Sequence, residues 1–157
     1  MLEFDCGDGT NGIGKLALGS YGTIEPIRFS PTGAADGIGL ILGATGSVMI
    51  QGDVNYGKLE FYAPTASVGA VTIGGSLTGA VADAVNGMLH AGELEFYGPA
   101  GMVKIGGSVI GGDRANTGTV TFHYSFNSLT IGSDVVGGNG TDAGEIVQLS
   151  RDRRPAV

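Results

Sequence analysis

The sequence predicts an all-β protein: a single-domain parallel β-solenoid of about four to five rungs. Two strand motifs each recur four times along the chain. Glycine makes up 31 of the 157 residues, where about 7% is usual. A supersecondary unit that recurs every 20 to 50 residues or so is typical of stacked-repeat architectures. Glycine interleaved with apolar residues indicates many tight corners between short buried strands.

The first motif is a short V-x-I strand that ends at a glycine turn. Its isoleucines lie 23, 32 and 26 residues apart. Alternation with period two places Ile105 and Val109 on one face of the strand and Lys104 on the other. On the same inner face, a small residue always lies between the two apolar positions, and we expect it to let the chain bend at a corner. The four copies are Val48–Val54, Val71–Leu77, Val103–Val109 and Leu129–Val135, with the small residues Gly52, Gly75, Gly107 and Ser133.

The second motif is an L-x-F strand that opens with glycine. The same alternation places Leu59 and Phe61 on the inner face. It places Lys58, Glu60 and Tyr62 on the outer face. The copies are Gly57–Tyr62, Gly92–Tyr97, Gly118–His123 and, more loosely, Gly144–Leu149.

Together the motifs predict two strands per rung, joined by a loop of variable length. Stacked rungs tolerate length variation at one corner because an insertion bulges outward. Like residues would then form columns. These columns are Phe61, Phe96 and Phe122, and Ile50, Ile73, Ile105 and Ile131. The alternative is an antiparallel β-sandwich, for which Val54–Lys58 would be an acceptable hairpin turn.

The domain organisation follows from where the motifs occur. Residues 1–46 are predicted to form an N-terminal cap or a degenerate rung, in which Gly14–Leu18 resembles the second motif. Residues 47–149 carry the solenoid repeats, and only Gly79–Leu89 has a pattern suited to a turn of helix. Residues 150–157 form a polar tail, in which Arg151–Pro155 is predicted to cap the last rung against edge pairing.

Charge and hydropathy exclude some function classes. The formal net charge is −7 with scattered basic residues, which argues against nucleic-acid binding. No apolar run approaches the roughly 20 residues that a membrane-spanning helix needs. The start, Met1–Asp5, lacks the features of a signal peptide. We therefore expect either a cytoplasmic protein or a piece of a longer secreted chain, and the single Cys6 leaves the redox compartment open.

The repeat resembles the I-G-G-[SD]-[VL] repeats of glycine-rich β-helix proteins of bacterial surfaces, grouped with haemagglutinin-like and autotransporter-like proteins. The resemblance covers roughly Ser47–Leu149. It implies a parallel β-helix with a surface or adhesive role, in an extracellular or cell-surface protein. It carries over no catalytic residue.

Two glycine-rich stretches look like nucleotide-binding loops and fail on context. Gly9–Lys15 fits G-x-x-x-x-G-K, but Leu16 stands where a Ser or Thr should hold magnesium. Ile41–Gly46 resembles a dinucleotide-binding turn, yet it leads into the Val48–Val54 strand instead of a helix. We expect no cofactor.

Three acidic, glycine-rich loops raise the question of calcium. Gly137–Asp142 matches the first six positions of a calcium-binding nonapeptide, but Gly144 occupies the apolar position and no tandem copy follows. Gly111–Asp113 and Asp5–Asn11 are similar in composition. We interpret all three as solvated acidic turns and predict no metal site.

Catalytic candidates are few. His90 and His123 are the only histidines, and we expect His123 to stack at the surface as the tyrosines do. Cys6 has no nearby histidine partner. Glu60 and Glu95 hold equivalent outer positions and could form a carboxylate pair of the kind that glycosidases use, but repetition explains them more simply. We predict no catalytic residues and no enzyme.

The leading functional hypothesis is a structural or adhesive module, with glycans or other surface proteins as partners. One alternative is a carbohydrate-binding or polysaccharide-degrading β-helix. Its outer face would carry Tyr62, Glu60, Tyr97, Glu95 and Tyr124. Another alternative is a filament-forming solenoid that associates end to end.

Overall fold

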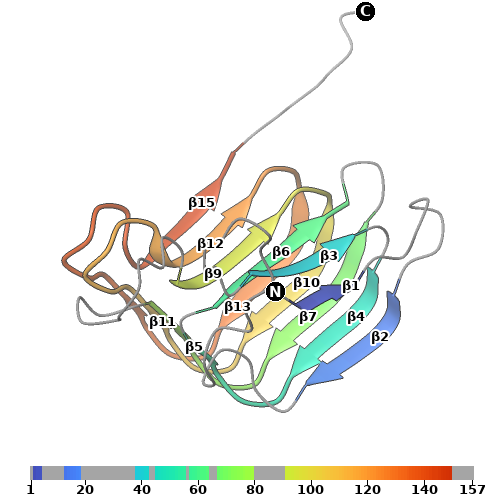
Figure 1. The fold of residues 1–157 in the computed structure, drawn as a ribbon, viewed down its shortest axis with the longest axis horizontal. Coiled ribbons are helices and arrows are strands. Elements are labelled where there is room, and N and C mark those ends of the chain that lie inside the picture. Colours follow the sequence, from blue (N-terminus) through green and yellow to red (C-terminus); the bar gives the residue numbers. More distant parts are fainter. Residues whose placement is uncertain are drawn as a thin grey trace, which may run out of the picture.

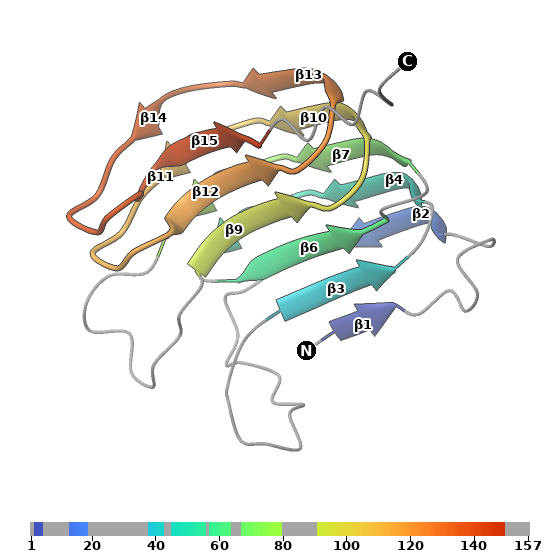
Figure 2. The same ribbon diagram turned by 90° about the horizontal axis from the view of Figure 1, so that it is seen from above.

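The computed structural model is a parallel β-solenoid of about four rungs, as the sequence predicts (Figures 1 and 2). All the elements in its described part are strands. The residues that it describes are 2–4, 13–18, 38–42, 45–55, 57–63, 67–79 and 91–149. Side chains are described within 45–55, 57–63, 67–79 and 92–149.

Three parallel sheets run along the solenoid. The first sheet is ordered β1 (Leu2–Phe4), β3 (Ile38–Leu42), β6 (Lys58–Tyr62), β9 (Ala91–Phe96), β12 (Thr117–Phe122) and β15 (Glu145–Gln148). The second is ordered β13 (Phe126–Ile131), β10 (Ala100–Ile105), β7 (Val68–Ile73), β4 (Thr45–Ile50) and β2 (Ile13–Leu18). The third is ordered β14 (Val135–Val136), β11 (Val109–Ile110), β8 (Leu77–Thr78) and β5 (Val54–Asn55). Figure 2 shows the arrows of the first sheet pointing one way and those of the second pointing the other.

Each complete rung has three strands, so the prediction of two strands per rung is wrong. The first motif divides at its glycine turn: β10 ends at Ile105, and β11 begins at Val109 in a different sheet. The hairpin alternative is also wrong. The two strands that meet within Val54–Lys58, β5 and β6, belong to different sheets and pair in parallel with other rungs. The antiparallel sandwich is therefore not the fold.

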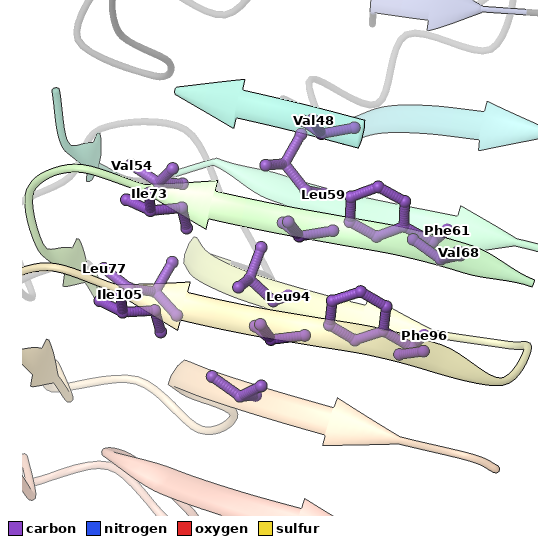
Figure 3. Close-up of a cluster of buried hydrophobic side chains, with 14 of the residues drawn as sticks. Val48, Val54, Leu59, Phe61, Val68, Ile73, Leu77, Leu94, Phe96 and Ile105 are labelled. Atoms are coloured by element: carbon purple, nitrogen blue, oxygen red, sulfur yellow. The ribbon is translucent and has the colours of Figure 1, made fainter. Parts of the chain in front are cut away.

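The core is built from like residues stacked in register, as predicted. Ile50, Ile73, Ile105 and Ile131 are aligned across β4, β7, β10 and β13. The ring centroids of Phe61 and Phe96 lie 4.8 Å apart, and those of Phe96 and Phe122 lie 4.9 Å apart. This spacing matches the distance of about 4.8 Å between neighbouring strands. Figure 3 shows Phe61, Phe96, Ile73 and Ile105 among the side chains of this core.

The glycine corner differs from the prediction by one residue. Gly52, Gly75 and Gly107 are half-buried at the turn, and Ser133 is exposed, so none of them occupies the inner face. Glycine is required one residue earlier, because a Cβ on Gly106 would overlap the carbonyl oxygen of Gly74. Within the turn, successive rungs therefore approach closely, backbone to backbone, at its first glycine.

A second glycine position marks the start of the last three strands of the first sheet, β9, β12 and β15. Gly92, Gly118 and Gly144 have φ values of 66°, 61° and 69°. A Cβ on Gly118 would also overlap the carbonyl oxygen of Ile110. The loop that leaves the third sheet is thus closed at its base by a residue that has to be glycine.

Three strands lie within the predicted N-terminal cap, and their backbones continue the sheets. The β2 strand pairs with β4, with Leu18 opposite Ile50. Gly14–Leu18 therefore corresponds to the first motif, and its assignment to the second motif is wrong. The β3 strand fills that role, because Ile41 lies opposite Phe61. The helical turn expected at Gly79–Leu89 and the tail at 150–157 lie outside the described residues, apart from Gly79.

Candidate functional site: a polar cluster on the outer face of the first sheet

The outer face of the first sheet carries three columns of side chains, because alternate residues of β6, β9, β12 and β15 point away from the core. The register aligns them across the rungs. The first column is Lys58, Glu93, Thr119 and Glu145. The second is Glu60, Glu95, Thr121 and Val147. The third continues the ladder with Tyr62, Tyr97, His123 and Leu149.

Lys58 lies at the centre of the charged part of this face. Its Nζ lies 3.5 Å from Glu60 Oε2 and 3.6 Å from Glu93 Oε1, and it donates a hydrogen bond to Glu95 Oε2. Burial by itself would lower the pKa of Lys58. The hydrogen bond to Glu95 and the negative charges of the three glutamates outweigh burial and raise that pKa above its usual value, so Lys58 is a cation.

Glu95 joins three rungs through its two carboxylate oxygens. While Oε2 accepts from Lys58, Oε1 accepts a hydrogen bond from His123 Nε2 at 2.7 Å. Burial would raise the pKa of Glu95, but hydrogen bonds from Lys58, His123 and Tyr97, with the charge of Lys58, lower it below its usual value. Glu95 is therefore held as the carboxylate.

The charged side chains are more buried than the sequence suggests. Parity correctly places Lys58 on the outer face, yet Lys58, Glu93 and Glu95 are only 8%, 6% and 7% exposed. Neighbours on the same face, one strand spacing away, pack against them. Glu93 and Thr119 were not among the candidate residues in the sequence. The opposite charges of Lys58 and Glu93 at one repeat position were the available signal.

The aromatic column packs against itself. Tyr97 and His123 are stacked, with centroids 4.1 Å apart and planes at 14°, so the predicted stacking of His123 is confirmed. Tyr62 and Tyr97 lie 5.5 Å apart at 50°. Burial, a hydrogen bond to Glu95 and the charges of Glu95 and Glu60 raise the pKa of Tyr97 to about 12.

A groove of about 550 Å³ runs over this face toward the last rung. Its lining combines carboxylates with apolar and hydroxyl groups. The lining residues are Lys58, Glu93, Glu95, Tyr97, Asn116, Thr119, Thr121, Asp142, Glu145, Val147 and Leu149. Thr119 is only 4% exposed, and its Oγ1 has no hydrogen-bond partner among the described residues.

Glu95 is poorly suited to act as the general acid of glycoside hydrolysis. That reaction needs one carboxyl group held protonated as a general acid, with a raised pKa. The pKa of Glu95 moves the other way, and Lys58 contacts both Glu60 and Glu95, the two carboxylates considered above as a pair. The absence of enzymatic activity stays a prediction.

The remaining sequence candidates lie apart from this face or outside the described residues. Lys15 lies within the strand β2. Ile41 and Gly46 lie in β3 and β4. Tyr124 lies in the bend after β12, one residue past the aromatic column. Cys6, His90, Asp5–Asn11 and the part of Gly9–Lys15 before Ile13 are outside the described residues.

Two of the three acidic loops considered for calcium, those at Gly111–Asp113 and Gly137–Asp142, stack on each other. Asn139 Nδ2 donates to Asp113 Oδ1 at 2.7 Å, and the amide of Asn116 donates to the carbonyl of Thr141 at 2.9 Å. In the described part of the chain, no three His, Cys, Asp or Glu residues are grouped so that they could hold a metal ion.

Comparison with known proteins yields no match to a family model, a curated protein or a solved structure. Within the described residues, no helix is long and apolar enough to cross a membrane.

Proposed function

We propose that the chain is a structural or adhesive β-solenoid module of an extracellular or cell-surface repeat protein, acting without catalysis. The observation that carries this proposal is the stacking of side chains from successive rungs on both faces of the first sheet. Phenylalanine rings stack inside. Outside, Lys58 pairs with Glu95 and Tyr97 stacks on His123. Polar groups that are already paired across rungs hold the stack together and leave few groups for chemistry.

The resemblance of the repeat to bacterial surface proteins supports the extracellular part of the proposal. The test has two arms. In the source cells, protease treatment of intact cells should remove the protein if it is at the surface. The chain displayed on a non-adherent bacterium should also raise attachment to glycan-coated or protein-coated surfaces. Ile105→Asp, which is expected to unfold, is the control. A protein that resists protease on intact cells and gives no attachment would contradict the proposal.

A filament-forming solenoid is the second candidate, supported by the last described rung. Its strands β13, β14 and β15 each form the outermost strand of a sheet, and Val135 and Ile146 are 47% and 37% exposed. Sedimentation velocity over a wide concentration range tests association. Val135→Lys should reduce association, and deletion of Arg151–Val157 should increase it if the tail is a cap. A monomer at all concentrations, in both the full and the truncated chain, would exclude this candidate.

Carbohydrate binding is the third candidate, supported by Tyr62, which is 47% exposed. Its ring lies beside Tyr97, near the carboxylates of the groove. A glycan array probed with the natural chain and with Tyr62→Ala tests this candidate. Binding that is equal for both proteins would exclude a role for this face.

A further inference from the structure

We infer that the groove on the outer face of the first sheet binds a primary ammonium group carried on an aliphatic stem. The ligand is either a lysine side chain of a peptide or a free aliphatic amine. The inference rests on the charges, the register and one unsatisfied hydroxyl, and it is independent of the proposed structural role.

The protein already contains one ammonium group bound in this way. Lys58 of the first outer column reaches Glu60 and Glu95 of the second column with its Nζ, and Glu93 lies beside them. Farther along the first column, the register continues with Thr119 and Glu145. Here the column presents oxygen atoms from its side chains.

The charge of the groove favours a further cation. Its lining contains four carboxylates, those of Glu93, Glu95, Asp142 and Glu145, against one ammonium group, that of Lys58. Asp142 and Glu145 are exposed, so they can meet a ligand without first leaving the interior. A bound cation is attracted by the excess negative charge at this end of the groove.

Thr119 is the second observation. It lies between Glu93 and Glu145 in the register, lines the groove and is almost fully buried. Its Oγ1 lacks a hydrogen-bond partner in the described part of the chain. Leaving a buried hydroxyl without a partner is unfavourable, and an ammonium donor would satisfy it.

The apolar part of the groove suits the stem of the ligand. Val147 and Leu149 belong to the lining on the last strand, together with the ring of Tyr97. Aliphatic stems of lysine pack along such apolar surface while the charged end reaches polar groups. No three acidic or histidine side chains are grouped for a metal ion in the part of the chain that is described. The chemistry therefore favours an organic cation.

The experiment titrates the natural chain, at low ionic strength, with acetyl-Gly-Lys-Gly-amide and with pentane-1,5-diamine. Binding is followed by amide chemical shifts in two-dimensional NMR. The matched control peptide carries norleucine in place of lysine. Saturable shifts at Thr119 and Glu145, with dissociation constants on the order of millimolar, are expected for the lysine peptide or the diamine. The norleucine peptide should leave these shifts unchanged.

Variants locate the site. Glu145→Gln should weaken binding by about threefold or more, because it removes a carboxylate from the groove. Asp134→Asn removes one exposed charge near the third sheet and should change affinity by less than about 1.5-fold. Thr119→Val keeps the shape of the side chain and should weaken binding without lowering the urea midpoint of the free protein.

The outcomes are decisive. Binding by the lysine peptide alone identifies a peptide ligand, and binding by the diamine alone identifies a free amine; both support the inference. No saturable shift with either probe, equal binding of the norleucine peptide, or equal weakening by Glu145→Gln and Asp134→Asn would overturn it.

Discussion

The rung built from β10 to β12 and the last described rung, built from β13 to β15, carry the same motifs in the same register but differ in burial. Val109 is fully buried, whereas its partner in the ladder, Val135, is 47% exposed. Val120 is fully buried, whereas Ile146 is 37% exposed. The motif therefore selects the inner face, and the rungs on both sides supply the burial.

The outer face shows the same dependence on neighbours. Glu93, between Lys58 and Thr119 in the register, is 6% exposed, whereas Glu145 on the last strand is exposed. In a stacked repeat, stability is approximately a sum over rungs and their interfaces. Equivalent substitutions should thus cost more inside the stack than at its described end.

The largest effect is expected for a charge placed in the isoleucine column. Ile105→Asp should lower the free energy of unfolding by about 4 kcal/mol or more, because it buries an unpaired carboxylate. Ile131→Asp, at the same position of the half-buried last rung, should cost about half as much or less. Lys104→Asp, on the opposite face, should change stability by about 0.5 kcal/mol or less. Equal urea midpoints for Ile105→Asp and Lys104→Asp would disprove the assignment of faces.

The next effect concerns the backbone. Gly118→Ala should cost about 2–4 kcal/mol, since φ is 61° and the new Cβ would overlap the carbonyl of Ile110. Gly137→Ala is the control in the last rung, because its Cβ would meet only Ala143 O, at 3.6 Å. That variant should stay within about 0.5 kcal/mol of the natural chain. Thermal melts of the two variants provide the measurement, and similar losses would argue against a special role for the loop base.

A third pair of variants compares the loss of methyl groups at a buried position and at an exposed one. Val109→Ala should destabilise the protein by about 2 kcal/mol, because it removes methyl groups from a closed core. Val135→Ala should cost about 0.5 kcal/mol or less, because the side chain is half exposed. If chemical denaturation gives the two variants the same loss, the last rung is covered in solution, as the filament alternative requires.

The smallest effect concerns pH and the polar cluster. The pKa of Glu95 is lowered in the folded protein. Its contribution to stability is therefore present above pH 4.5 and is lost as pH falls through the folded pKa. Glu95→Gln should be less stable than the natural chain at pH 7, and this difference should narrow below pH 4.5. Urea midpoints measured between pH 7 and pH 3 check this, and a constant difference would show that the cluster does not stabilise the fold through the charge of Glu95.

The sequence predicted much of the fold and less of the site. The parallel stacking, the phenylalanine column and the stacking of His123 followed from repeated residue types at matching positions. The polar cluster did not. Lys58 and Glu95 are 37 positions apart, and parity alone cannot tell whether an outward side chain meets water or another side chain. Thr119 gave no signal, because an unsatisfied hydroxyl depends on the geometry of its neighbours.

The sequence by itself determined which apolar residues face the core and that like would lie upon like there. Alternation is a local property of an extended chain, and the repeats carry it from rung to rung. Tertiary structure alone decided that a rung has three strands, that Gly14–Leu18 joins the second sheet, and that Lys58, Glu93 and Glu95 are buried. Each of these depends on which residue of another rung lies opposite, at strand spacing, and contacts of that kind form only when the rungs stack.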